Sequence, residues 1–325
     1  MNKWFKFLNI GFCLIIITMS CTETKKNEEL AEEIKQESLT VLRDVLYQQN
    51  EWVKVHAAEF LLWSGYPEDV RDIYLKEEIE YGTQPKYRIG IWRVLAQAAE
   101  DTIEKKQWTD KILGAFLDEN GEDRIHAAET LAKLGISPLH TDEEVTRRAI
   151  ASSVKSLSLY TLWSVSYTSK AMKDSVMQEM MARVLSADEV PVVSNQASYI
   201  IRQLGGLSVP QWEQLAQEVV QGNGKDNINL LSALFIHAAD PVKNSEVYQK
   251  IHQEVVNFKT SDSKGERSEM AYALGKSGTK EDLPILLGLL RAESALQSEE
   301  DNEDVKASAA YGLLLLNQKI KSSNH

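Results

Sequence analysis

Two pairs of side chains combine the residue types of a metal or acid–base site. His56 precedes Glu59 by three residues, and His126 precedes Glu129 by the same interval, each within the motif His-Ala-Ala-Glu. Residues three apart share one face of a helix, so each imidazole can meet its carboxylate. Such a pair could supply two ligands to a metal ion or move a proton between its members.

The spacing of the two motifs argues against a shared metal site. They lie seventy residues apart, at the same point of an internal repeat, and stacked helices about 10 Å apart would hold the two histidines about 20 Å from one another. One pair alone offers two ligands, whereas a catalytic zinc ion takes three from the protein. The sequence therefore predicts surface polar pairs, His56 with Glu59 and His126 with Glu129, and neither a metal ion nor another cofactor.

Motifs for other chemistry are absent from the sequence. Gly275-Lys276-Ser277 resembles the end of a phosphate-binding loop, but the required earlier glycine is Met270 and no strand pattern precedes it. There is no GxSxG, no HExxH and no paired-cysteine spacing. A net charge of -12 repels phosphate backbones. We expect no nucleotide, no nucleic acid and no catalytic activity, although carboxylates that meet only in the folded chain leave the enzyme alternative open.

The elements that carry these residues are helices. Apolar residues recur at helical spacing between residues 38 and 317, and strand signals are scarce, so the predicted fold class is all-α. A pair of small residues, often with a glycine eight positions after its first member, recurs at a period of about 35 residues. The repeats are marked by Ala57, Ile91, Ala127, Ala197, Ser232, Met270 and Ala309, with a faint copy near Leu162.

The small pair and the glycine have physical explanations. Alanines let two helix axes come nearer than the usual distance of about 8–10 Å. Glycine accepts the left-handed conformation that ends a helix at its C-terminal cap. The predicted caps are Gly65, Gly135, Gly205 and Gly278. An amphipathic second helix follows, for example over residues 70–79 and 283–293.

The stretch GERSEMAYALGKSGTKEDLPILLGLL (265–290) resembles a HEAT repeat of the short kind found in phycobilisome-lyase proteins, and VKASAAYGLLLLN (305–317) resembles a last, partial unit. The resemblance covers about 280 residues. It implies an α-solenoid, a HEAT-like superhelix of about seven to eight helix pairs, whose concave face binds proteins.

The same resemblance gives a role to a basic residue near the start of each first helix. In such repeats this residue holds an acidic group of a neighbouring unit. We therefore expect an inter-repeat structural role for Lys54, Arg88, Arg124, Arg267 and Lys306. Ser194 and Asn229 replace the basic residue in two units.

The N-terminus has the layout of an exported protein. Lys3 and Lys6 precede an apolar run that is too short to cross a membrane, and Ser20-Cys21 follows. The segment resembles a bacterial lipoprotein signal, although Thr18 stands where leucine is usual, and this implies cleavage before Cys21 and acylation of that cysteine. The predicted organisation is a signal peptide at 1–20, a charged tether at 21–36, the solenoid at 37–318 and a tail at 319–325.

These features lead to one hypothesis and two alternatives. We expect a non-catalytic scaffold in the bacterial cell envelope. The resemblance to lipoproteins implies a preference for the outer membrane, because in that family an aspartate after the acylated cysteine favours the inner membrane and threonine follows Cys21 here. A protein is the expected partner, and the lipid is the expected membrane contact. The first alternative is a glycan-binding accessory of polysaccharide processing, suggested by the aromatic content. The second is a bilin-lyase-like modifying enzyme, which an exported location disfavours.

Overall fold

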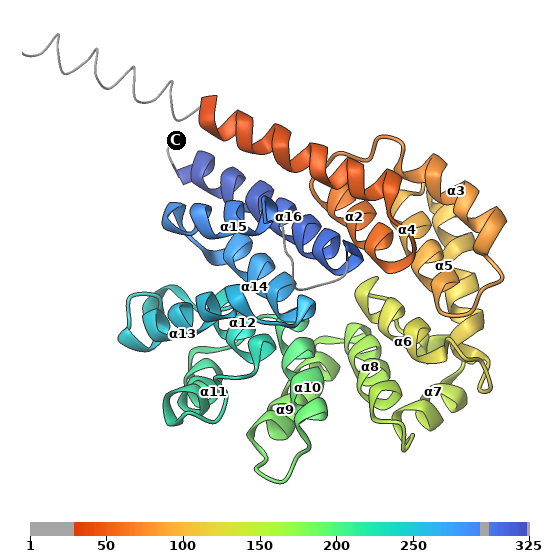
Figure 1. Ribbon diagram of the computed structural model, residues 1–325. Helices are drawn as coiled ribbons and strands as arrows, with labels where there is room; N and C mark the ends of the chain where they lie inside the picture. The colour runs from red at the N-terminus through yellow and green to blue at the C-terminus, as the bar shows by residue number, and fades with distance from the viewer. Residues whose placement is uncertain (1–28, 293–298, 324–325) are drawn as a thin grey trace, which may run out of the picture.

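The computed structural model describes residues 29–292 and 299–323. Over these ranges the chain is all-helical and contains no strand, as the hydrophobic pattern predicts. Sixteen α-helices follow one another there: an N-terminal helix over residues 29–48, and then α2 to α16 (Figure 1). None of the described helices is both long enough and apolar enough to cross a membrane. The expected signal peptide and Cys21 lie outside the described residues.

Every second helix belongs to an inner ring, in which each member packs against the next (Figure 1). The inner ring comprises α2 (Glu51–Trp63), α4 (Tyr87–Ala98), α6 (Arg124–Lys133), α8 (Lys155–Val165), α10 (Pro191–Leu204), α12 (Ile228–Ile236), α14 (Lys264–Ser277) and α16 (Glu299–Ser323). The last member, α16, also packs on α2, so the helix contacts form a closed cycle. The sequence did not predict this closure.

The remaining helices lie outside the inner ring, each packed on one or both of its chain neighbours (Figure 1). After the N-terminal helix they are α3 (Val70–Tyr81), α5 (Thr102–Leu117), α7 (Glu143–Ile150), α9 (Lys170–Leu185), α11 (Val209–Gln221), α13 (Glu246–Asn257) and α15 (Leu283–Leu290). Short 3-10 turns occur at Pro138–His140, Ser166–Thr168, Asp240–Val242, Phe258–Thr260 and Lys280–Asp282. The described chain thus forms eight helix pairs.

The small residues of the repeat lie where inner helices approach one another. The pairs from Ala57-Ala58 to Ala309-Ala310 are fully buried. A close approach joins α14 and α16, where a Cβ atom added to Gly275 would lie 2.6 Å from the Cα of Gly312. No real Cβ contact is that short, so these two helices can cross only because both residues lack a side chain.

The predicted glycine caps are confirmed at Gly65 and Gly135, whose φ angles of +82° and +70° other residues rarely adopt. Gly205 also has a positive φ, +59°, but its ψ of -175° is extended rather than left-handed helical. The prediction is wrong at Gly278, whose φ is -63°. Glycine is needed there for a different reason, because a Cβ atom would lie 2.4 Å from the carbonyl oxygen of Leu274.

A seam of polar contacts joins the first two helices to α15 and α16 and closes the ring. The side-chain amide of Asn317 donates to the carbonyl oxygen of Ala31 at 2.6 Å, and Arg291 pairs with Glu37 at 2.6 Å. In Figure 1 the N-terminal helix runs beside α16. We call this junction the closing seam; it comprises the pairs Ala31–Asn317, Glu37–Arg291 and His56–Asp304.

Regular helix extends beyond both predicted boundaries of the folded body. Residues 29–36, assigned to the tether, are helical, and Ile34 is buried, because a single apolar side chain on the inner face anchors an otherwise polar helix turn. Residues 319–323, assigned to the tail, belong to α16. The Lys319 ammonium donates to the carbonyl oxygens of Ser277 and Gly278 at the end of α14. Because both terminal segments have few apolar residues, the hydrophobic pattern did not place them in the folded body. Polar contacts hold them there instead.

Candidate functional site

One repeat position brings its side chains together in the interior of the inner ring. It is the second residue after the first member of the small pair. The position is occupied by Glu59 in α2, Arg93 in α4, Glu129 in α6, Tyr199 in α10, Leu234 in α12, Tyr272 in α14 and Tyr311 in α16. Charged side chains therefore gather on the α2–α6 part of the ring and mainly aromatic ones on the α10–α16 part.

A buried ion pair links α2 to α4. Arg93 donates to both carboxylate oxygens of Glu59, at 2.7 and 2.8 Å, and the Gln97 amide donates to the same carboxylate at 2.8 Å. The two charged side chains are only 2% and 4% exposed. Burial acts to raise the pKa of Glu59, but the charges of Arg93 and Lys133 and these hydrogen bonds outweigh it and hold that pKa below its ordinary value.

The predicted surface polar pairs are wrong. Glu59 is buried, and its partner is Arg93 rather than His56. The Nδ1 of His56 instead bonds Asp304 of α16 at 2.7 Å, so this histidine belongs to the closing seam. Both side chains bond to residues of neighbouring helices rather than to each other. The spacing of residues within one helix does not predict such contacts.

The members of the second predicted pair, His126 and Glu129, also have different contact partners. The carboxylate of Glu129 pairs with Lys133, one turn further along α6, at 2.9 Å. The imidazole of His126 lies against the indole of Trp52, with 5.4 Å between ring centres, and burial lowers its pKa. Neither histidine therefore presents a ligand pair with its glutamate.

An aromatic arc lines the opposite part of the ring interior. The Arg202 guanidinium lies 4.9 Å from the ring centre of Tyr199 and 4.6 Å from that of Tyr272, and pairs with Glu269 at 2.9 Å. Tyr272 faces Tyr311 at 6.2 Å. Burial outweighs the arginine charge and raises the pKa of Glu269. The arc continues to α2 through Phe60, whose ring stacks on Tyr311 at 4.6 Å.

The interior of the ring contains the residue types of an active site, but its carboxylates are paired with cations as in a protein core. A general base needs a lone pair that can reach a substrate, and the carboxylate of Glu59 already accepts three hydrogen bonds in a place that is 4% exposed. Glu129 and Glu269 each have a cation within 3 Å. We interpret the interior as a polar core that fixes the helices relative to one another.

Each of the five basic residues given a structural role makes a polar contact, and four of these contacts reach a group outside the helix that carries the basic residue. Arg88 reaches forward from α4 to Asp123, just before α6, at 2.6 Å, and Lys54 pairs with Glu77 of α3. Arg124 reaches back to the carbonyl oxygen of Phe116 at the end of α5, at 2.9 Å. The other two have local contacts: Arg267 donates to the carbonyl oxygen of Ser261, and Lys306 pairs with Glu303.

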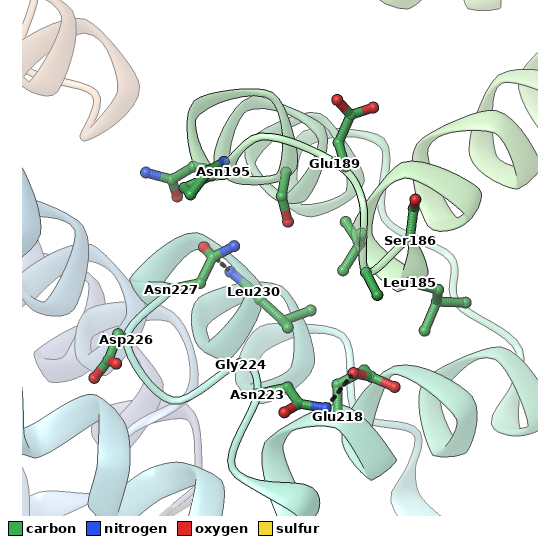
Figure 2. A pocket seen from close by; sticks show the side chains of 14 residues that line it. Leu185, Ser186, Glu189, Asn195, Glu218, Asn223, Gly224, Asp226, Asn227 and Leu230 are labelled. Carbon is green, nitrogen blue, oxygen red and sulfur yellow. Dashed lines mark hydrogen bonds between the residues drawn. The ribbon is translucent and has the colours of Figure 1, made fainter.

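A pocket opens at the corresponding junction where the basic residue is missing. It has a volume of about 500 Å³ and lies between the end of α9 and start of α10 on one side and the end of α11 and start of α12 on the other (Figure 2). The lining residues are Val184, Leu185, Ser186, Ala187, Glu189, Pro191, Ser194, Asn195, Glu218, Asn223, Gly224, Asp226, Asn227 and Leu230. The volume falls within the usual range for small-ligand sites.

Local hydrogen bonds hold the rim of the pocket. Asn227 caps α12 by accepting from the backbone N–H of Leu230 at 3.1 Å, and Asn223 donates to Glu218 at 3.1 Å (Figure 2). Gly224 permits the turn between them, because a Cβ atom there would lie 2.7 Å from a methyl group of Leu230. The rim is therefore shaped by the turn before α12.

Comparison of the chain with protein-family models, with curated proteins and with solved structures gives no match. On geometry, the pocket is the candidate binding site, because it combines a cavity of about 500 Å³ with polar groups at its edge, whereas a second cavity, beside Tyr66 and Asn317, has a volume of about 180 Å³. The sequence held signals for both regions. Opposite charges at one repeat position indicated the pairing of Glu59 with Arg93, and the break at Ser194 and Asn229 marked the pocket.

Proposed function

We propose that the chain is an exported, lipid-anchored α-solenoid of the HEAT-like kind, closed into a ring, that binds a protein partner without catalysing a reaction. The lipid would be attached at Cys21 and would hold the protein at the cell envelope, preferably at the outer membrane. The partner would bind as a polypeptide segment in the pocket between α10 and α12.

The lining of the pocket carries this proposal. Leu185, Pro191 and Leu230 offer apolar surface, while Asn195 and Asn223 place side-chain amides at the edge. An asparagine amide both donates and accepts, as a peptide group does, so it can pair with an extended backbone while the apolar surface receives side chains. The charged groups of Glu59, Glu129 and Glu269 in the inner ring already pair with Arg93, Lys133 and Arg202, so the pocket is the better docking place.

Site-specific photo-crosslinking tests the partner. A photoreactive amino acid at the exposed position Asn195, on the pocket rim, is expected to capture a discrete polypeptide in intact cells. The same amino acid at Ile103 of α5, which is 70% exposed and distant in sequence from the pocket, is the matched control and should not capture it. The absence of a polypeptide adduct from position 195 would contradict the proposal.

Replacement of Cys21 tests the anchor. The variant Cys21→Ser should lose fatty-acid labelling and leave the membrane fraction, whereas Ser20→Ala, one residue earlier, should retain both. Unchanged membrane fractionation of Cys21→Ser would exclude anchoring by a lipid at this cysteine.

One observation supports glycan binding as a second candidate. Trp63 is 49% exposed and packs beside Phe60 and Tyr311, with ring centres 5.8 Å from each, so it offers an aromatic face to a sugar. It is the only exposed tryptophan among the described residues. Saturable oligosaccharide binding that is lost in Trp63→Ala would favour this candidate over a protein partner.

A further inference from the structure

The pocket between α10 and α12 occupies a place that other helix pairs fill with their own basic side chain. In α4, Arg88 reaches the carboxylate of Asp123, in the turn before the next inner helix. In α2, Lys54 reaches the carboxylate of Glu77, on the following outer helix. Arg88 thus links α4 to the turn before the next inner helix, and Lys54 links α2 to the outer helix of its own repeat. In both places a basic side chain that starts near the beginning of an inner helix ends on an acid.

At the third such place the cation is missing and the acids are present. Ser194 occupies the position of the basic residue, and its short side chain lines the pocket. Glu218 lies on the following outer helix, α11, as Glu77 lies on α3, and Asp226 lies in the turn before α12, as Asp123 does before α6. Acids from both kinds of element therefore border the space that a lysine or arginine would fill.

The acids of the pocket differ in their partners. Glu189 is paired with Arg183 at 3.2 Å, so it is already neutralised. Glu218 accepts a hydrogen bond from the neutral amide of Asn223, and over residues 29–292 and 299–323 no lysine or arginine pairs with it. The next inner helix also lacks the basic residue, since Asn229 stands there and donates to Asn195 at 2.8 Å. No cation from either helix enters the pocket.

We infer that the pocket receives a lysine or arginine side chain of the partner polypeptide, which pairs with Glu218 as Lys54 pairs with Glu77. This inference rests on the proposed function and adds the chemistry of the bound segment. The apolar floor suits the methylene stem of such a side chain, and the acids suit its charged end. The net charge of -12 favours the approach of a cationic segment.

Two peptides that differ only in charge provide the test. Acetyl-Gly-Gly-Arg-Gly-Gly-amide carries the guanidinium, and the same peptide with citrulline has nearly the same shape but no charge. Titrated into the full-length protein and followed by the NMR signal of the Asn195 side chain, the arginine peptide should bind at least tenfold more tightly. Equal affinities, or no saturable binding of the arginine peptide, would overturn the inference.

Two variants assign the effect to the pocket. Ser194→Arg restores the basic residue of the repeat and should fill the pocket from within, so it should abolish binding of the arginine peptide. Glu218→Gln should reduce the preference for arginine over citrulline to below threefold. If Ser194→Arg does not fold, the binding measurements on Glu218→Gln decide the question alone. Glutamine has nearly the same shape as glutamate, so this variant is expected to fold. Retention of the full preference in Glu218→Gln would overturn the inference.

The outcome is separable from that of the proposed function. If the photoreactive group at position 195 captures a polypeptide while the two peptides bind equally, the partner is a protein but not one recognised by a cationic side chain. If no polypeptide is captured, the proposed function itself fails.

Discussion

Two regions of this molecule solve the same geometrical problem in opposite ways. Between α2, α4 and α6, long side chains of successive inner helices pair with acids: Arg93 with the buried Glu59, and Arg88 with Asp123 just before α6. Between α10 and α12, Ser194 stands at the repeat position that Arg88 holds in α4, and a pocket of about 500 Å³ is open beside it. The helical framework is the same, and only the length and charge of a few residues differ.

The difference shows how a repeat architecture can separate stability from binding. Where the basic and acidic residues of the repeat are present, they pair with one another between helices. Where the basic residue is missing, the junction keeps its acids and its apolar walls but gains room for another molecule. We therefore expect substitutions in the first region to change stability and substitutions in the second to change binding.

The largest effect is expected from Arg93→Ala. It leaves the buried carboxylate of Glu59 without its cation, which typically costs about 3–5 kcal/mol of unfolding free energy. Urea denaturation measures this change. The control is Arg147→Ala on α7, whose pair with Glu143 is 70% and 63% exposed and should contribute little. Equal losses in both variants would remove the distinction between a buried network and a surface ion pair.

A somewhat smaller effect is expected where α14 crosses α16. Gly275→Ala places a methyl group on the backbone of Gly312, and overpacking of this kind costs about 1–3 kcal/mol. Gly288→Ala on α15 is the matched control, because a Cβ atom there meets nothing within 4 Å and alanine favours the helix. Thermal unfolding of both variants checks the prediction, which would be refuted by a Gly275→Ala variant as stable as the control.

The pH dependence of stability sharpens the comparison further. The folded-state pKa of Glu59 lies below its ordinary value of 4.5, so its contribution is present above pH 4.5 and is lost as the pH falls through the folded-state pKa. Glu59→Gln has no titrating group there, so its unfolding free energy should fall less steeply in acid than that of the natural protein. Above pH 6 the two curves should be parallel; parallel curves in acid as well would contradict the prediction.

The smallest effect on stability is expected in the pocket. Glu218→Gln changes a partly exposed side chain whose one observed partner is Asn223, so the unfolding free energy should stay within about 0.5 kcal/mol of that of the natural protein. Its effect should appear in the arginine-peptide titration instead. A loss comparable to that of Arg93→Ala would make the pocket part of the structural core.

The sequence predicted the helices better than their partners. The period of the small pairs placed the inner helices, and the glycine caps at Gly65 and Gly135 have the predicted conformation. Such features depend on neighbours along the chain. The polar pairs could not be predicted from neighbours along the chain, because the partners of His56 and Glu59 come from α16 and α4, 248 and 34 residues away.

The pocket was visible in the sequence only as an exception. Ser194 and Asn229 broke the pattern of basic residues, but a missing side chain shows neither whether the space closes nor which acids border it. Those answers depend on how Leu230 and the turn at Gly224 pack. The closure of the ring could not be predicted either. A periodic sequence pattern indicates that each unit packs on the next, but it does not give the rotation between units, whose sum determines whether the ring closes.

The closing seam also changes how the whole molecule can come apart. An open array of repeats unravels from its ends, because a terminal unit has only one neighbour. Here the first and last units hold one another through Asn317, Arg291 and His56, so each unit has two neighbours. No unit can leave without breaking two interfaces at once. The chain should therefore unfold as a single cooperative body, and a new pair of termini cut elsewhere in the ring should leave it intact.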